Sequence, residues 1–119
     1  IYHANVQTTN ATPTTIFSLV TASGGSNGTT YTLEATISLG DVTGGANTGS
    51  YRFLFKTKNI GGTITTSSIV SNISILDGGL SATAVSTSTS GANVLVQVTG
   101  IAATTINWNG TFTITAQEF

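Results

Sequence analysis

The chain has 119 residues, which is long enough to enclose one hydrophobic core and short for two, so we predict a single domain over residues 1–119. Only 6% of the residues are charged and the formal net charge is -1, which excludes the basic stripe that nucleic-acid binding requires. Cysteine is absent, so disulfides and thiolate metal sites are excluded, and no segment has the roughly 20 consecutive apolar residues that insertion into a membrane requires.

Apolar and polar residues alternate with a period of two along the chain, and no segment repeats apolar residues at helical spacing over three turns. The first predicted elements are an edge strand over 3–9 and a strand over 14–21, which follows Pro13. The clearest strand is TTYTLEATISLG, residues 29–40. Its predicted buried face carries Tyr31, Leu33, Ala35, Ile37 and Leu39.

The next predicted strand, SYRFLFKTKNI over 50–60, has one aromatic face and one basic face. The inner face carries Tyr51, Phe53 and Phe55, and the outer face carries all the cations of the chain, Arg52, Lys56 and Lys58. Further candidate strands are 63–76, 81–87, 93–100 and 105–116. Segments rich in Gly and Asn, which tolerate the positive φ of tight turns, separate the strands at 23–28, 40–49, 61–62, 77–79 and 90–93. About eight short strands without helices predict an all-β fold, an antiparallel β-sandwich or jelly roll.

The stretches ANVLVQVTG (92–100) and TTINWNGTFTITA (104–116) are predicted to form a hairpin that closes the sandwich. Val94, Val96 and Val98 share one face of the first strand. The large apolar residues of the second strand share one face as well, and they are Ile106, Trp108, Phe112 and Ile114. This parity predicts that Trp108 is a buried core residue and not an exposed platform for a sugar.

Few side chains could titrate or attack a substrate. They are His3, Glu34, Asp41, Asp77 and Glu118. No G-x-S-x-G or comparable motif singles out a serine for a Ser-His-Asp set, and the carboxylates are far apart in the sequence. The loop over 40–49 offers one Asp, one Asn and backbone carbonyls, fewer carboxylates than a calcium site usually has. We therefore interpret these residues as strand, turn and terminal residues, and we predict no catalytic residue, no metal site and no cofactor; the sequence singles out no ligand-binding residue.

Two long stretches carry a family pattern, VQTTNATPTTIFSLVTASGGSNGTTYTLEATI (6–37) and GANVLVQVTGIAATTINWNGTFTI (91–114). Together they resemble the small all-β domains at the C-termini of structural proteins of tailed phages and large algal viruses. The matching residues are 10–14 (NATPT), 93–100 (NVLVQVTG), Thr105 and Trp108, whereas residues 41–90 depart from the pattern.

The resemblance implies a C-terminal fragment of a longer virion protein, of the fibre, spike or tail-tip type, displayed on the virion surface. It also implies a homo-oligomer, expected to be a trimer, contacts with other virion proteins, and contact with a host-surface glycan or receptor. Because this family has no catalytic motif, we expect no enzyme. A chain that opens on Ile1 rather than on Met is also interpreted as a piece of a longer polypeptide.

Two alternatives stay open at the level of the sequence. A carbohydrate-binding module of a secreted enzyme or adhesin would require Trp108 and Tyr51 to be exposed on one flat face. A hydrolase would require two of Glu34, Asp41, Asp77 and His3 to lie within reach of each other in one cleft.

Overall fold

The computed structural model describes residues 1–23 and 27–119, and these residues form nine strands and one short 3-10 helix. The strands are β1 (Tyr2–Thr8), β2 (Thr14–Val20), β3 (Thr29–Asp41), β4 (Thr48–Ile60), β5 (Thr63–Thr66), β6 (Val70–Leu76), β7 (Ala84–Ser90), β8 (Asn93–Thr99) and β9 (Ile106–Glu118), and the helix is η1 (Gly78–Leu80). The predicted all-β, antiparallel sandwich is confirmed, with nine strands because the segment 63–76 divides into β5 and β6. No helix in the described residues is long and apolar enough to cross a membrane.

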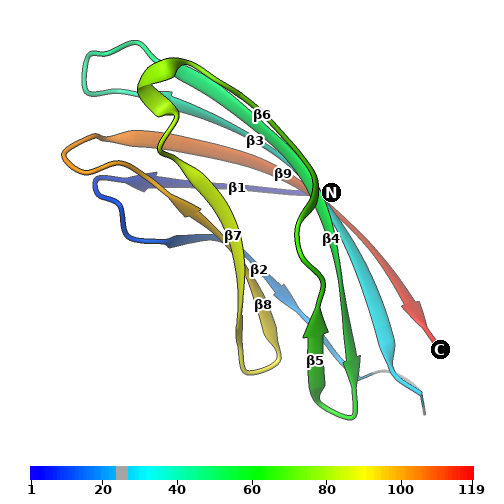
Figure 1. Cartoon of the computed structure of the whole chain (residues 1–119). Helices are drawn as coiled ribbons and strands as arrows, with labels where there is room; N and C mark the ends of the chain where they lie inside the picture. Colours follow the sequence, from blue (N-terminus) through cyan, green and yellow to red (C-terminus); the bar gives the residue numbers. More distant parts are fainter. Residues whose placement is uncertain (24–26) are drawn as a thin grey trace.

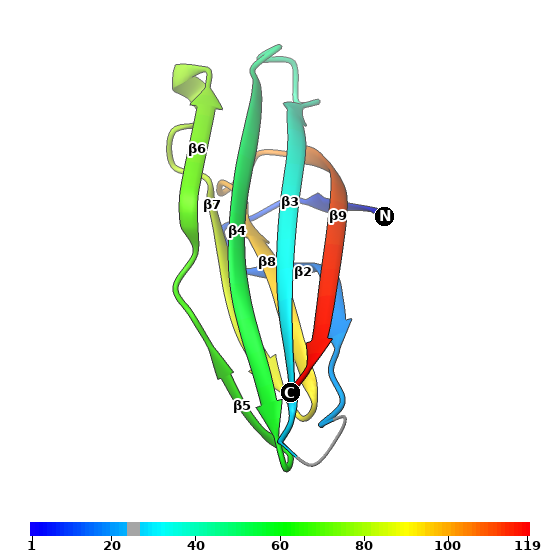
Figure 2. The same cartoon turned by 90° about the vertical axis from the view of Figure 1, so that its right-hand side faces the viewer.

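Two antiparallel sheets pack face to face (Figure 1). The larger sheet has six strands in the order β1-β9-β3-β4-β5, and β6 pairs with another part of β4; the smaller sheet has the order β2-β8-β7. Seen from the outside of the larger sheet, β5 and β6 lie beside β4 at one edge, and β9 lies beside β3 on the other side, between β3 and the edge strand β1 (Figure 2). Because β3, β4 and β9 have 13 residues each, the molecule is elongated, with extents of 53 × 22 × 21 Å.

Tight turns join neighbouring strands where the sequence predicts them. Gly61 and Gly62 connect β4 to β5 with φ angles of 59° and 91°, the pair of positive φ angles of a type I′ turn. Gly91 opens the turn from β7 to β8 with φ of 58°. The predicted turn over 23–28 includes residues 24–26, which lie outside the described residues.

The core lies between the two sheets and follows the predicted alternation. The inner face of β3 is buried at every second residue from Leu33 to Leu39, and Arg52, Lys56 and Lys58 all point outward from β4. Trp108 is 0% exposed, as predicted. The largest fully buried side chains are Trp108, Phe53, Phe55, Phe112, Leu33, Ile37, Leu80, Ile106, Val94, Val96, Val98 and Thr57.

The predicted hairpin between residues 92–100 and 104–116 is wrong. β8 pairs with β2 and β7 in the smaller sheet, whereas β9 pairs with β1 and β3 in the larger sheet. Both strands bury the predicted apolar faces, with Ile114 only partly buried, but they approach the same core from opposite sides. The alternation of apolar and polar residues determines which face of a strand is buried, but it does not determine which strand pairs with it. The connection over 100–105 is long enough to cross the roughly 10 Å between packed sheets, so β8 and β9 can belong to different sheets.

Candidate functional surfaces

The aromatic side chains that could have stacked on a sugar belong to the core. The indole Nε1 of Trp108 donates a hydrogen bond of 2.9 Å to Oγ1 of Thr8, and the hydroxyl of Tyr51 lies 2.7 Å from Oγ1 of Thr83. Both rings are buried, and they stack with their centroids 6.5 Å apart. They therefore present no flat face to solvent, which rules out a carbohydrate-binding module built on these rings.

Asp41 and Asp77 act as turn residues, in agreement with their sequence interpretation. Oδ1 of Asp41 accepts a hydrogen bond of 2.8 Å from the backbone N–H of Thr43, and Oδ2 of Asp77 accepts one of 2.9 Å from the backbone N–H of Thr48. The carboxylate of Asp41 thus stabilises the loop between β3 and β4, and the carboxylate of Asp77 stabilises the first residue of β4. Among residues 1–23 and 27–119, no group of three or more His, Cys, Asp or Glu side chains is placed to hold a metal ion.

The other titratable side chains lie apart on the surface. His3 is exposed on β1, with Nδ1 3.4 Å from Oγ1 of Thr111, and Glu34 is exposed on the outer face of β3. β9 lies between the strands that carry them. Glu118, predicted as part of a terminal tail, instead ends β9 opposite Thr29. Within the described part of the chain, His3 and these carboxylates therefore share no cleft in which they could work together.

One part of the outer face of β1, β9 and β3, away from Glu34, forms a polar surface without Lys, Arg, Asp or Glu. Residues in register across the three strands share this face; for example, Asn5 lies opposite Asn109, which lies opposite Ser38. A hollow of about 260 Å³ opens there, and Nε2 of Gln7 donates a hydrogen bond of 2.8 Å to Oδ1 of Asn107 beside it. This surface, the polar face, consists of His3, Asn5, Gln7, Thr36, Ser38, Asn107, Asn109 and Thr111.

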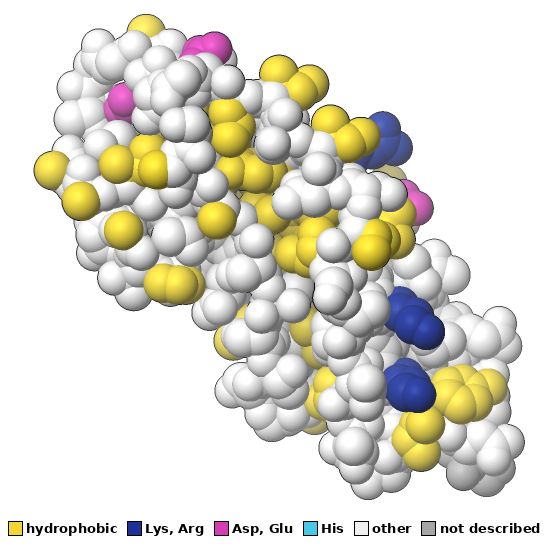
Figure 3. Space-filling model, in the orientation of Figure 1, with side chains coloured by type: hydrophobic (Ala, Val, Ile, Leu, Met, Phe, Trp, Pro, Cys, Tyr) yellow, Lys and Arg dark blue, Asp and Glu magenta, His cyan; other side chains and the backbone are white. Residues whose placement is uncertain are grey.

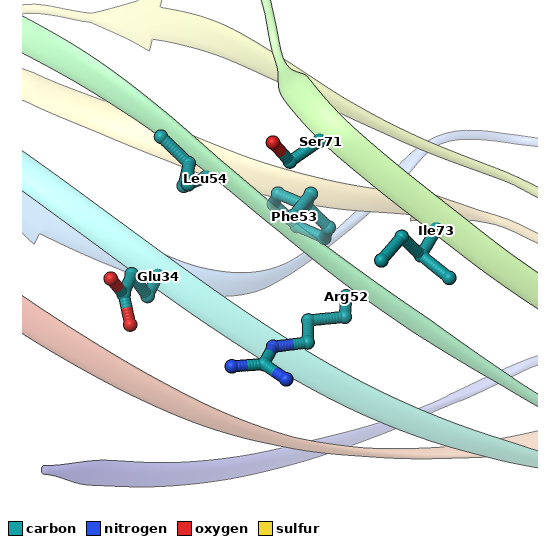
Figure 4. A pocket seen from close by; sticks show the side chains of 6 residues that line it. All are labelled: Glu34, Arg52, Phe53, Leu54, Ser71 and Ile73. Carbon is teal, nitrogen blue, oxygen red and sulfur yellow. The ribbon is translucent and has the colours of Figure 1, made fainter.

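Apolar side chains stay exposed on the opposite edge of the larger sheet, where β6 has β4 as its neighbour. Ile73 and Ile75 are 56% and 72% exposed, and they are in register with Arg52 and Ser50 on β4. We call Leu54, Val70, Ile73 and Ile75 the β6 flank. A cleft of about 220 Å³ passes through it, and Figure 4 shows Ile73 and Ser71 on β6 beside Arg52, which extends from β4 across β3.

A second apolar surface lies where the edge of the smaller sheet meets β1 and β9. Val20 is 71% exposed and Tyr2 is 55% exposed. The ring of Tyr2 packs 5.5 Å from that of Phe17, which in turn stacks on Phe112 in the core at 4.5 Å. Ile114 on β9 completes a hollow of about 330 Å³. We call Tyr2, Phe17, Val20 and Ile114 the β2 flank.

Sequence reasoning missed both flanks, and the signal it used explains why. Ile73 and Ile75 alternate with Asn72 and Ser74, a pattern that predicts one buried face, yet six of the seven residues of β6 are exposed. Because Ile73 and Ile75 are in register with Arg52 and Ser50, their side chains lie on the outer face of the larger sheet, away from the smaller sheet. The space-filling view shows the few charged groups gathered at one end and along one side of an otherwise uncharged surface (Figure 3).

No protein-family model and no curated protein matches the sequence. Two solved structures of phage tailspike proteins are similar in fold. The tailspike protein of Acinetobacter phage vB_ApiP_P1 aligns with 95% of this chain and 22% of its own, at 19% identity and a TM-score of 0.45. The tailspike protein of Acinetobacter baumannii phage AM24 aligns with 95% of this chain and 26% of its own, at 11% identity and a TM-score of 0.48. The chain thus spans about a quarter of the length of these neighbours, and at such values the likeness concerns the fold alone.

Proposed function

We propose that this domain is a non-enzymatic structural module of a virion, a fibre head, spike or capsid-attached domain at the particle surface. In this proposal it serves assembly by associating with copies of itself, as a trimer, and it contacts other virion proteins. The sequence resemblance over 6–37 and 91–114 supports the viral class. The separation of His3, Glu34 and the turn-forming aspartates supports a role without catalysis.

The observation that carries the assembly role is the exposure of large apolar side chains on strands at the sheet edges. Soluble monomers rarely leave apolar patches on edge strands uncovered, and they usually protect such edges with charge, proline or a covering loop. β6 has no charged residue and no proline. Burial against another protein surface would carry little desolvation cost for the exposed side chains of Val20, Ile73 and Ile75, because these side chains have no polar group that needs a hydrogen-bond partner.

Self-association is the first expected result. The purified domain should have the mass of an oligomer, with three copies in the proposed trimer, when light scattering is measured across a concentration series. Because apolar burial drives the contact, raising the salt concentration should not dissociate it. A mass of one chain at millimolar concentration would contradict the assembly role.

Contact with a host-surface glycan is a second proposed role, and the polar face favours it. Its hollow is lined by amide and hydroxyl side chains that can donate and accept hydrogen bonds without charge. On an array of bacterial and algal surface glycans, we expect binding that weakens at least tenfold in Asn5→Ala and Asn109→Ala. Binding that persists in both variants, or its absence in the wild-type domain, would count against this role.

A further inference from the structure

We propose that the outer face of β4, where it meets β6, binds an acidic polysaccharide, a chain of sugars that carries carboxylate groups at intervals. This inference deepens the proposed contact with a host-surface glycan and rests on it, but it concerns a different surface from the polar face. The surface consists of two adjoining hollows that share Leu54, and we call them the paired hollows. The first is lined by Glu34, Arg52, Phe53, Leu54, Ser71 and Ile73, and the second by Thr32, Leu54, Phe55, Lys56, Ser67 and Val70.

The paired hollows repeat the same three kinds of chemical group. Each has one cation, Arg52 in the first and Lys56 in the second, and each has an alcohol side chain, Ser71 in the first and Thr32 in the second. The remaining lining is mostly apolar, and the volumes are about 220 and 380 Å³. A cation can bind a carboxylate, an alcohol can exchange hydrogen bonds with a sugar hydroxyl, and apolar side chains can contact the C–H groups of a sugar ring. The repeat therefore predicts two successive binding positions along one sugar chain.

A β-bulge between β4 and β6 contributes to the wall of the first hollow. Arg52 is in register with Ile73 and Leu54 with Val70, so the register shifts between these two pairs. Ser71 lies in the shifted segment with φ of 51°, a left-handed conformation that residues other than glycine rarely adopt. Bulges redirect side chains and are common beside active sites. Here the bulge places Ser71 in the hollow that Arg52 lines (Figure 4).

The charges around the paired hollows fit a ligand with spaced carboxylates. Arg52 and Lys56 are exposed on one face of β4 and lie four residues apart, which is about 13 Å along the strand. Glu34 is in register with Leu54, so it lies on the neighbouring strand between the two cations. Its carboxylate repels a dense row of negative charge, such as the phosphates of a nucleic acid, more than it repels carboxylates spaced to meet the two cations. A polysaccharide with one carboxylate in each short repeat therefore fits this surface better than a nucleic acid.

The same two cations favour an acidic ligand over an uncharged protein surface as the occupant of the paired hollows. An uncharged protein surface would bury Arg52 and Lys56 without partners, and removing an unpaired charge from water has a large free-energy cost. An acidic sugar chain instead supplies a carboxylate to each cation. Val20 and Ile75 line neither hollow, so they stay available for the proposed contact between copies.

The test is isothermal titration calorimetry of the chain with a hyaluronan octasaccharide, in which glucuronate alternates with an uncharged sugar. The wild type should bind it. A carboxyl-reduced form of the same oligosaccharide should bind at least about tenfold more weakly, because the charge-assisted hydrogen bonds to the cations are lost. Arg52→Gln and Lys56→Gln should each weaken binding to a similar extent. Lys58→Gln is the matched control and should keep the wild-type affinity, since Lys58 is also exposed on the outer face of β4 but lines neither hollow.

The direction of the effect at Glu34 tests the charge argument. Glu34→Gln removes the carboxylate that repels the ligand, so this variant should bind the octasaccharide more tightly than the wild type. Weaker binding in Glu34→Gln, or equal binding of the acidic and the carboxyl-reduced oligosaccharides, would overturn the inference, because the ligand would not be recognised by its charge. Equally tight binding of polyglutamate would overturn it as well, because the surface would recognise carboxylates without their sugars.

Other outcomes separate this inference from the proposed function. If Asn5→Ala weakens binding and neither Arg52→Gln nor Lys56→Gln does, the glycan binds the polar face, so the proposed contact stands and the paired hollows are wrong. If either cation variant lowers the oligomeric mass in light scattering, the hollows belong to a contact between copies and the inference is wrong. If the wild type binds neutral glycans and not the octasaccharide, this inference alone fails, whereas binding of no glycan at all contradicts the proposed glycan contact too. Circular dichroism of every variant verifies that the fold is retained.

Discussion

Replacing Trp108 with Ala should lower the free energy of unfolding by about 3–5 kcal/mol, the cost of removing a large aromatic side chain from a packed core. Trp108 is fully buried, and Val6 on β1 and Leu39 on β3 lie on either side of it in register. The change would also leave the buried hydroxyl of Thr8 without the hydrogen bond that the indole N–H donates. Chemical denaturation monitored by circular dichroism measures the difference.

Tyr2→Ala is the matched control for Trp108→Ala. Tyr2 is also aromatic, but it is 55% exposed at the edge of the sandwich, so its removal should cost much less than the removal of Trp108. A Trp108→Ala protein that keeps wild-type stability and loses binding to a partner would show that Trp108 is a ligand contact and not a core residue.

Replacing Gly110 with Val should destabilise the fold by about 1–3 kcal/mol, because the new side chain would overpack the core. A Cβ at position 110 would lie 2.6 Å from two ring atoms of Phe112 and 3.4 Å from the side chain of Ile37. The ring of Phe112 has little freedom to move away, since it is fully buried and stacked on Phe17. Thermal unfolding should show the loss as a lower Tm.

Gly40→Val provides the comparison within the same sheet. Gly40 lies in β3, and a Cβ at this position would meet no atom within 4 Å. Because valine has a higher strand propensity than glycine, the free energy of unfolding of this variant should equal or slightly exceed that of the wild type. Equal destabilisation at positions 40 and 110 would mean that the strand backbone, and not the Phe112 ring, requires glycine.

The sequence predicts those features that depend on alternation within one strand. The inner faces of β3 and β4, the outward direction of the cations and the burial of Trp108 all follow from a period of two, because a residue in a strand points to the opposite face from its neighbours. Glycine pairs such as Gly61–Gly62 likewise predict tight turns, because both residues need a positive φ.

Features that depend on which strands meet could not be read from the sequence. β8 and β9 each have the pattern of a half-buried strand. This pattern is compatible with a direct pairing of the two strands and equally compatible with the observed arrangement, in which they belong to different sheets. The exposure of Ile73 and Ile75 depends on the register between β6 and β4, which places both side chains on the outer face of the larger sheet beside Arg52 and Ser50. Both apolar flanks therefore appear only once the strands are paired.

The place of β9 in the larger sheet has a consequence for biosynthesis. This strand contributes Trp108 and Phe112 to the core and lies between β1 and β3, yet it leaves the ribosome after the eight other strands described for this domain. Until it arrives, β1 lacks its neighbour, and β1 and β3 expose unpaired backbone edges. Pairings between strands so distant in sequence form slowly, and chains that wait with open edges are prone to aggregate. A chain that stops before residue 106 cannot close this core, so synthesis of β9 and acquisition of the native fold are coupled in this domain.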